Sequence, residues 1–448
     1  MNFTHPFLQK LSSHNLQVKA LIYDDKESSY KDLLLKTKEK LELLKTIPHN
    51  QILGILGDFD INSIAFLLAC IECKRIVGLF SDENELTSKI NEASISVIFK
   101  DNTLSYAQND AQKASSTNAL LQDLQNKGSS GLILFSSGST GKPKAILHNL
   151  DTLLESYLDK KPKKMNILLF LMFDHIGGIN TLFNCLSMGA CGIALKERKN
   201  VDILAQNIEK YKIALLPASP SLLNLMLLAK VSLKYDLSSL RLITYGTEKM
   251  PDILLEKLKA EFKGVRFHQT FGTSEIGITQ TKTHKNYIKL ENIDYKIVNN
   301  ELYLRSKTQS LGYLNASNEA FRDDGYFATG DLVELINIDG EEYLKIIGRN
   351  KELINVGGEK VLPSEVEGVL LEFESIVDCL VFGIANPLTG QSVGVKVVLK
   401  EGINLSALEL KKQIKAFCKN KLAAYKIPTK VEIVEKLEIS TRFKKVRK

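Results

Sequence analysis

Short apolar runs alternate with amphipathic patterns between about residues 131 and 272. The apolar runs have the length of β-strands, for example GLILF at 131–135, CGIAL at 191–195 and LRLITYG at 240–246. Between them, apolar residues recur every three or four positions, as in PSLLNLMLLAK at 220–230, which is typical of helices. Alternating strands and helices need crossover connections, so we expect a mostly parallel sheet with helices on both faces. The pattern predicts an α/β protein.

The flanking regions have different patterns. The first 128 residues repeat the alternation more loosely, and the polar stretch 109–130 predicts a mobile connection. Residues 290–347 hold strand-like runs joined by turns, which indicate a small antiparallel β subdomain. After Gly348, strands and two amphipathic helices predict an α+β unit. We therefore predict a large N-terminal domain, 1–348, of parallel-rich α/β subdomains plus the antiparallel subdomain, and a smaller C-terminal domain, 349–448.

Composition limits the possible classes of protein. The longest apolar runs, such as ILLFLMF at 167–173, fall well short of the ~18 residues of a membrane span, and the first residues lack a secretory signal, so we expect a cytoplasmic protein without stable membrane insertion. Cys70 and Cys73 have CxxC spacing but lie in a buried helical pattern, which argues against a metal or redox site. Residues 411–448 hold 13 Lys and Arg against three Glu, without the interleaved aromatic residues that nucleic-acid grooves favour. We expect no nucleic-acid partner, and the oligomeric state stays open.

The run LFSSGSTGKPKAI at 134–146 has the composition of a phosphate-binding loop. It is not a Walker loop, because serine stands where that motif has its first glycine and Pro143 follows the lysine. Two glycines allow successive N–H groups to converge, and hydroxyl and ammonium groups add donors and charge. A polyphosphate fits this chemistry. The candidate residues are Ser136, Ser137, Gly138, Ser139, Thr140, Gly141, Lys142 and Lys144.

Residues 132–148 closely resemble the phosphate-loop signature of the adenylate-forming superfamily, which includes acyl- and aryl-CoA ligases, adenylation domains of nonribosomal peptide synthetases, and luciferases. The later motifs of that superfamily appear in the expected order: FDHIGGI at 173–179, YGTEKM at 245–250, FGTSE at 271–275, GYFATGD at 325–331 and GRNKELINVGGEKVLPSEVE at 348–367. The resemblance implies a ligase that uses ATP and Mg²⁺ to convert a carboxylic acid into an acyl-adenylate with release of pyrophosphate. A thiol, of CoA or of the phosphopantetheine of an acyl carrier protein, then takes the acyl group.

The resemblance also implies roles for individual residues at the nucleotide. The loop at 136–144 would hold the β- and γ-phosphates. Glu275 matches the glutamate that holds Mg²⁺, and Ser274 the hydroxyl beside the α-phosphate. Phe271 and Gly272 would lie on one face of the adenine, with the backbone of Gly246 and Thr247 on the other. Asp331 would accept hydrogen bonds from the ribose hydroxyls, and Arg349 would contact the ribose.

The C-terminal end, STRFKKVRK at 440–448, resembles the segment that carries the catalytic lysine of the family. It aligns Lys444 with that lysine, with Lys445 as a competitor. Phe443 stands where the family has glycine. The resemblance further implies that the C-terminal domain rotates between the two half-reactions about a hinge at Lys351, and that Gly357 and Gly358 line the pantetheine tunnel.

The acyl-pocket motif leaves the acid open. His175 matches a pocket residue that moves aside to open the thiol tunnel in many acyl-CoA ligases, and Gly178 follows it in the same motif. Asp174 can be aligned with the aspartate that pairs with the α-ammonium group of amino-acid substrates, and a buried carboxylate without a partner would be costly. We favour a fatty, aryl or other organic acid. The alternatives are an amino-acid-activating, carrier-loading ligase, or a degenerate member that only binds an acyl-adenylate or CoA thioester.

Overall fold

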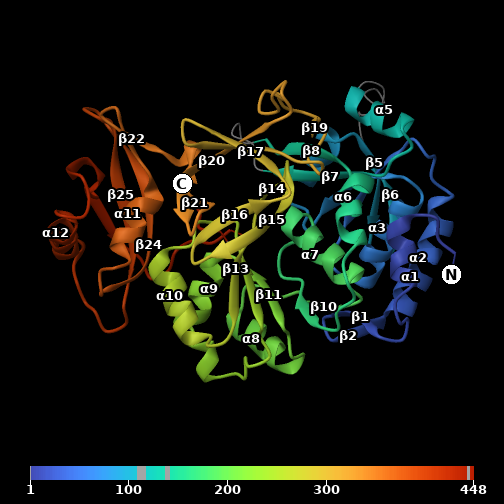
Figure 1. The fold of residues 1–448 in the computed structure, drawn as a ribbon, viewed down its shortest axis with the longest axis horizontal. Helices are drawn as coiled ribbons and strands as arrows, with labels where there is room; N and C mark the ends of the chain where they lie inside the picture. Colours follow the sequence, from blue (N-terminus) through green and yellow to red (C-terminus); the bar gives the residue numbers. More distant parts are fainter. Residues whose placement is uncertain (1, 108–117, 137–141, 441–443, 448) are drawn as a thin grey trace.

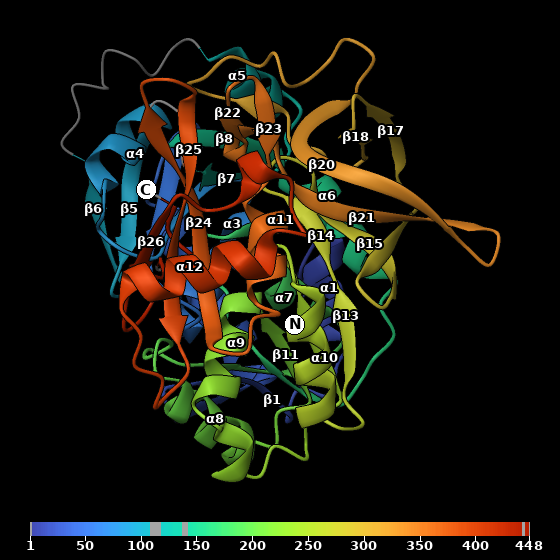
Figure 2. The same cartoon turned by 90° about the vertical axis from the view of Figure 1, so that its left-hand side faces the viewer.

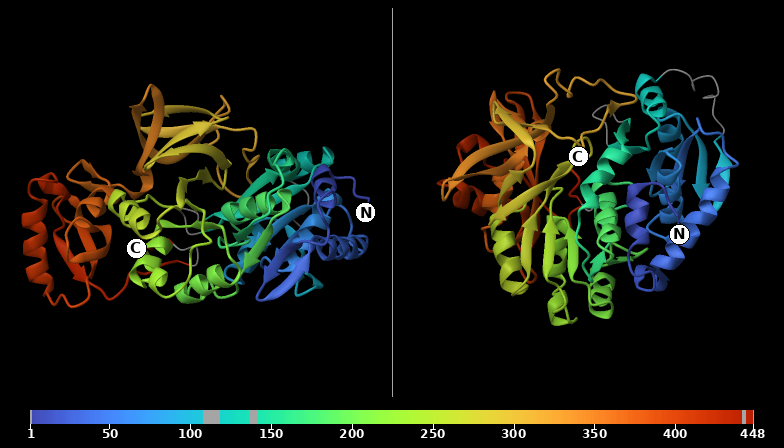
Figure 3. Two further views of the ribbon diagram at one scale, coloured as in Figure 1. Left: turned by 60° about the horizontal axis from the view of Figure 1, so that its bottom comes forward. Right: turned by 45° about the vertical axis from the view of Figure 1, so that its right-hand side comes forward.

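The computed structural model describes residues 2–107, 118–136, 142–440 and 444–447. Its strands form four sheets, and the C-terminal domain lies at the opposite end of the molecule from the N-terminus (Figure 1). Turned end-on, the molecule shows helix α12 of this domain (Ala407–Cys418) across its near face (Figure 2). In the left-hand view of Figure 3, the antiparallel sheet, in gold, is seen apart from the C-terminal domain and from the α/β part of the N-terminal domain.

The first sheet, sheet A, is mostly parallel, and an antiparallel hairpin, β1–β2, forms one edge. Its order is β13 (Arg266–Gln269), β12 (Leu242–Tyr245), β11 (Leu215–Ala218), β9 (Asn166–Leu168), β10 (Cys191–Ala194), β1 (Lys19–Tyr23) and β2 (Lys26–Ser29). One face packs on α8 (Val201–Lys210), α9 (Pro220–Leu228) and α10 (Asp252–Glu261), through a core of apolar residues from all three helices.

Sheet B combines a parallel centre with antiparallel edges. Its order is β19 (Gly312–Tyr313), β8 (Lys144–Asn149), β7 (Gly131–Ser136), β4 (Ile76–Phe80), β3 (Ile52–Leu56), β5 (Ile95–Lys100) and β6 (Thr103–Tyr106). One large core fills the space between sheets A and B, and its residues come from both sheets and from α1 (Pro6–Ser12), α2 (Tyr30–Leu44), α3 (Ile61–Glu72), α6 (Leu150–Leu158) and α7 (Ile176–Ser187). The outer face of sheet B carries α4 (Leu86–Glu92) and α5 (Ala119–Asn126).

Two local expectations were wrong. The strand at 131–135 does not join the sheet of residues 166–269: it pairs in sheet B with β4, and hairpin β1–β2 from the start of the chain joins sheet A instead. Hydrophobic pattern predicts that a strand exists but not which sheet it enters. Part of the predicted mobile connection 109–130 is helix α5, because Leu121 and Leu124 fall on one face and are buried; residues 108–117 lie outside the described part.

The remaining strands confirm the expected antiparallel and α+β units. The antiparallel sheet has the order β14 (Phe271–Thr273), β15 (Gly277–His284), β16 (Tyr287–Glu291), β21 (Glu341–Arg349), β20 (Phe327–Ile338), β18 (Glu301–Arg305) and β17 (Asp294–Val298). The C-terminal domain has β22 (Ile354–Val356), β23 (Glu359–Val361), β24 (Ile376–Asn386), β25 (Gly390–Leu399), β26 (Lys430–Ile433), α11 (Pro363–Leu370) and α12. The described part of the chain also contains the short 3₁₀ turns η2 (Val231–Leu233), η3 (Asn350–Glu352) and η4 (Ala424–Lys426).

Within the described ranges, no helix combines the length and apolarity needed to cross a bilayer. Cys70 is buried and Cys73 is half-buried, and burial raises the pKa of both thiols. A raised pKa keeps a thiol protonated, so neither is set up as a thiolate ligand or nucleophile.

Candidate active site

Asp331 and Arg349 face each other across strands β20 and β21, whose register pairs these two positions. Arg349 donates to both carboxylate oxygens of Asp331, with Nε–Oδ1 2.7 Å and Nη2–Oδ2 3.5 Å. Asp331 is 3% exposed, and burial raises the pKa of its carboxyl while the charge of Arg349 opposes that rise. The structure thus places the two residues assigned to the ribose in direct contact. Their contact with a ribose stays a prediction.

Glu275 lies near this pair, on the turn between β14 and β15. The charge of Asp331 raises the pKa of Arg349 most, burial lowers it, and the charges of Glu352 and then Glu275 raise it by smaller amounts. One carboxylate oxygen of Glu275, Oε1, accepts a hydrogen bond of 2.9 Å from the hydroxyl of Tyr313. No cluster of three or more His, Cys, Asp or Glu suited to a metal occurs within the described ranges. One carboxylate nevertheless suits Mg²⁺, which commonly binds one or two protein carboxylates together with substrate phosphates.

The two ends of the predicted phosphate loop are fixed by strands β7 and β8, which pair Ser136 with Lys144. The ammonium group of Lys144 lies 4.6 Å from the ring centroid of Tyr313, the same tyrosine that holds Glu275. The side chain of Asn315 fixes the backbone next to the loop. It donates a hydrogen bond to the carbonyl of Pro143 (2.8 Å) and accepts one from the amide of Ala145 (2.9 Å). Lys142 is exposed. The predicted loop residues Ser137, Gly138, Ser139, Thr140 and Gly141 lie outside the described residues.

The backbone around Ser274 is held by a buried histidine. His148, on β8, is 1% exposed, and its Nε2 lies 2.7 Å from the carbonyl oxygen of Ser274. Burial lowers the pKa of His148 to about 4. The ring is therefore neutral at pH 7, and Nε2 must carry the proton to donate to this carbonyl. His148 thereby ties the turn with Ser274 and Glu275 to the strand that ends the phosphate loop.

The residues assigned to the adenine lie on two adjacent segments. A Cβ at Gly246 would approach Thr270, 2.7 Å from its Oγ1, and Thr247 has a φ of 71°. The Gly246–Thr247 turn therefore lies against the start of β14. Phe271 is 8% exposed and packs in the core of the antiparallel sheet, and a Cβ at Gly272 would lie 2.3 Å from the carbonyl of Gly277. Packing alone accounts for both residues here, and their contact with adenine stays a prediction.

The two candidate lysines of the tail lie in different surroundings, and the catalytic role of Lys444 stays a prediction. Lys445 donates through Nζ to Asp378 (2.5 Å) and to the carbonyl of Cys379 (3.0 Å), so its side chain is engaged in the C-terminal domain. Two positions on, Arg447 makes a bidentate ion pair with Glu367, at 2.6 and 2.9 Å. The charge of Lys444 acts on the Asp331 carboxyl and, like that of Arg349, opposes the effect of burial on its pKa. Phe443 lies outside the described residues.

The predicted hinge and tunnel residues lie at the start of the C-terminal domain. Lys351 is exposed in the 3₁₀ turn η3, directly after β21. Gly357 and Gly358 form the turn between β22 and β23 with φ values of +62° and +94°, a region that favours glycine. Apart from its chain neighbours, no atom of the described residues lies within 4 Å of a Cβ built at Gly358. Hinge motion and tunnel contact stay predictions.

The acyl-pocket motif forms the start of helix α7, which contacts β15 beside Glu275. His175 is the N-cap of α7, and its Nδ1 accepts a hydrogen bond from the amide of Gly177 (3.1 Å). A Cβ at Gly178 would lie only 2.0 Å from the carbonyl oxygen of Met172, so helix packing requires this glycine. Asp174 is half-buried, and its amide donates to the hydroxyl of Ser81 (3.2 Å). Asp174 is thus not fully buried, and its contact with a substrate stays a prediction.

Sequence reasoning missed four residues that support this site: Tyr313, Asn315, His148 and Glu248, whose Oε1 accepts a 2.8 Å hydrogen bond from the backbone amide of Lys445. Tyr313 and Asn315 stand in GYLN at 312–315, outside every motif, and nothing in their local pattern points to the loop some 170 residues earlier. His148 ends the phosphate-loop signature and Glu248 lies within YGTEKM, so both could have been selected by position in a motif.

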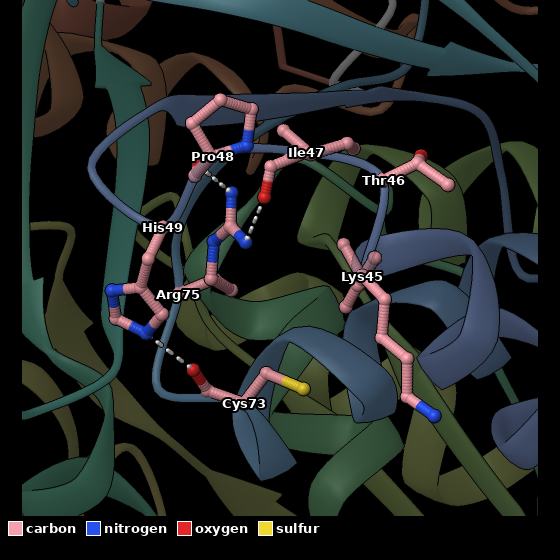
Figure 4. A pocket seen from close by; sticks show the side chains of 8 residues that line it. Lys45, Thr46, Ile47, Pro48, His49, Cys73 and Arg75 are labelled. Atoms are coloured by element: carbon pink, nitrogen blue, oxygen red, sulfur yellow. Dashed lines mark hydrogen bonds between the residues drawn. The ribbon is translucent and has the colours of Figure 1, made fainter.

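A separate pocket of about 560 Å³ lies near the start of β3 and β4 (Figure 4). It is lined by Leu44, Lys45, Thr46, Ile47, Pro48, His49, Cys73 and Arg75. Arg75 donates hydrogen bonds to the carbonyls of Ile47 and Pro48. Its buried guanidinium thereby stabilises the loop between α2 and β3. None of the predicted site residues lines this pocket.

Known proteins share this organisation. The profile of the AMP-binding enzyme family matches residues 53–314, more than half of the chain, and that of the AMP-binding enzyme C-terminal domain matches residues 365–444. Acyl-CoA synthetase 7 of Caenorhabditis elegans is 29% identical over 68% of this chain, and the match spans about three fifths (61%) of that relative's length. The 2-succinylbenzoate–CoA ligase of Staphylococcus epidermidis is 27% identical and is matched over 100% of this chain and 97% of its own length.

Among solved structures, o-succinylbenzoate coenzyme A synthetase from Bacillus subtilis in complex with ATP and magnesium ion superposes with a TM-score of 0.74 at 21% identity, covering 99% of this chain and 98% of that one. This likeness confirms the fold. Together with the two family matches, it establishes that the chain belongs to the family of AMP-binding, adenylate-forming enzymes, with both the N-terminal and the C-terminal part of that family present.

Proposed function

We propose that the protein is an ATP-dependent acid:thiol ligase. It would join a carboxylic acid to AMP with release of pyrophosphate and then pass the acyl group to the thiol of CoA. The observation that carries the proposal is the cluster of Glu275, Asp331, Arg349 and Lys444, which come from four separate segments of the chain and act on one another electrostatically. The CoA ligases among the relatives support CoA as the acceptor.

The chemistry explains why cations and carboxylates gather here. In the first step a carboxylate oxygen of the acid attacks the α-phosphate, a P–O bond forms, and the bond to pyrophosphate breaks. Two anions must approach each other, so the site has to offset negative charge at the α-phosphate. Lys444 would supply that charge beside the ribose-binding pair, and Lys144 would do so at the β- and γ-phosphates. Mg²⁺ held by Glu275 would add further neutralisation.

In the second step the thiol sulfur attacks the acyl carbonyl carbon, the thiol proton passes to solvent, and AMP leaves. This step needs an approach for the thiol rather than a lysine at the phosphate. We propose that the C-terminal domain, taken as residues 349–448, turns about Lys351 between the steps, so that Gly357 and Gly358 come to line the path of the pantetheine arm. The phosphopantetheine of an acyl carrier protein is the alternative acceptor.

A pyrophosphate-release screen tests the proposal. The full chain is incubated with ATP, Mg²⁺ and a panel of aromatic, fatty and amino acids, with and without CoA. We expect release that depends on one class of organic acid, together with loss of free thiol when CoA is present. The absence of acid-dependent release with the whole panel would overturn the proposal. In that case calorimetry with ATP would tell a degenerate binding module from a protein that does not bind the nucleotide.

The amino-acid-activating alternative rests on Asp174. Asp174 is half-buried, so burial alone does not require a cationic partner for it. We favour an organic acid as the substrate, because the relatives include a 2-succinylbenzoate–CoA ligase. Release that occurs only with an amino acid, and that is lost in Asp174→Ala, would favour the alternative.

A further inference from the structure

Glu248 joins the N-terminal domain to the tail that carries Lys444. It follows the Gly246–Thr247 turn and lies between helix α9 and the tail. One carboxylate oxygen, Oε2, accepts from Ser221 through the hydroxyl (2.6 Å) and the amide (3.3 Å). The other, Oε1, accepts a 2.8 Å hydrogen bond from the backbone amide of Lys445. Glu248 therefore contacts both parts of the molecule with separate atoms.

The N-terminal side of this contact is preorganised. Ser221 is 4% exposed and lies in the first turn of α9, where the helix dipole favours a carboxylate. Three donors thus fix the carboxylate group of Glu248 in one orientation: the hydroxyl and amide of Ser221 and the amide of the tail. An oriented carboxylate is a strong acceptor for a backbone amide.

The other side of the tail is held by the C-terminal domain. The side chain of Lys445 is bound to Asp378 on β24, and that of Arg447 to Glu367 on α11. These two ion pairs would move with the C-terminal domain, whereas the hydrogen bond from the Lys445 amide to Glu248 connects that domain to the N-terminal part. The residue before this amide is Lys444, whose charge reaches Asp331.

We propose that Glu248 is a positioning residue for adenylate formation. By holding the amide of Lys445 it docks the tail and keeps Lys444 beside Asp331. Because the bond spans both domains, it must break when the C-terminal domain leaves this arrangement. Glu248 would then support the first half-reaction and contribute nothing to the second. This inference rests on the proposed function and adds a named contact that distinguishes the two steps.

The test compares both half-reactions in Glu248→Ala, in Glu248→Gln, and in the control Glu256→Ala, which removes an exposed glutamate of the nearby helix α10. Adenylation is followed as ATP–pyrophosphate exchange with the acid found in the screen, and thioester formation as a single turnover of added acyl-adenylate with CoA. Loss of a hydrogen bond to a charged acceptor corresponds to roughly a tenfold slower exchange or more. We expect that loss in Glu248→Ala, a smaller loss in Glu248→Gln, and wild-type thioester formation in all three.

A second measurement is independent of turnover. Hydrogen exchange of the peptide that contains residues 444–447 should be faster in Glu248→Ala than in the wild type and unchanged in Glu256→Ala. Equal slowing of both half-reactions, unaltered adenylation, or unaltered exchange protection of the tail would each overturn the proposal. If the wild type shows no pyrophosphate exchange with any acid, the proposed function fails, whereas the hydrogen-exchange result still decides whether Glu248 docks the tail.

Discussion

His148 shows how one buried ring can set the pH range over which the site keeps its shape. Its pKa is lowered by burial from 6.5 to about 4, so between these values the unfolded chain binds a proton that the folded protein does not. Stability from this group is therefore complete above about pH 6.5 and is lost as the pH falls toward 4. The turn that carries Ser274 and Glu275 depends on the neutral form, because Nε2 must donate to the Ser274 carbonyl.

We expect wild-type protein to lose about 2 kcal/mol more unfolding free energy than His148→Gln when the pH is lowered from 7 to 5. Glutamine can still donate to the carbonyl but does not titrate, so it serves as the matched control. Urea unfolding at the two pH values measures the difference. An equal loss of unfolding free energy in the two proteins would mean that the pKa of this ring is not lowered as its burial indicates.

At the scale of elements, helix α7 depends on a single glycine. The Met172 carbonyl leaves no room for a Cβ at Gly178, at 2.0 Å, so Gly178→Ala must displace the helix or the preceding turn. We expect a loss of about 3 kcal/mol, at the upper end of what overpacking usually costs. Thermal unfolding measures it.

The matched control is Gly368→Ala in helix α11, where, among the described residues outside the adjoining helix backbone, no atom lies within 4 Å of the new Cβ. Alanine is the better helix former, so this variant should gain up to about 1 kcal/mol. A Gly178→Ala protein as stable as the wild type would show that the turn at Met172 adjusts freely, and would leave substrate contact as the reason for glycine there.

The same elements show how far the sequence could predict this fold. Most strands and helices followed from apolar periodicity, since burial of one face is a local requirement of each segment. The sheet to which each strand belongs did not follow from this periodicity. The run VRFHQTF at 265–271 has the pattern of one strand, yet β13 ends at Gln269 and β14 begins at Phe271 in a different sheet. The apolar pattern of these seven residues does not show that the first part pairs with β12 and the last part with β15.

The site was predictable to the extent that its residues stand in motifs. Asp331 and Arg349 were selected from separate motifs, and the register of β20 and β21 makes them partners. Tyr313, which links Lys144 with Glu275, was missed because its role exists only after three segments have come together. Supporting residues of this kind have no local signature.

At the scale of the whole molecule, the neighbouring lysines 444 and 445 should have separate roles. We expect Lys444→Ala to slow adenylation by ~10²- to 10³-fold with little change in stability, since it removes one electrostatic stabiliser of the transition state. Lys445→Ala leaves Asp378, which is 8% exposed, without its ion-pair partner, and should cost about 3 kcal/mol of unfolding free energy. Pyrophosphate exchange and urea unfolding of both variants check this division. Reversed effects would assign the catalytic role to Lys445.

The position of hairpin β1–β2 in sheet A has a consequence for how the chain is made. Its parallel neighbour, β10, ends at Ala194, so during synthesis the strand Lys19–Tyr23 is finished long before the edge it pairs with exists. Contacts this distant along the chain close slowly. Until residues 191–194 have been synthesised, strand β1 can pair only with β2, and its other edge has no partner.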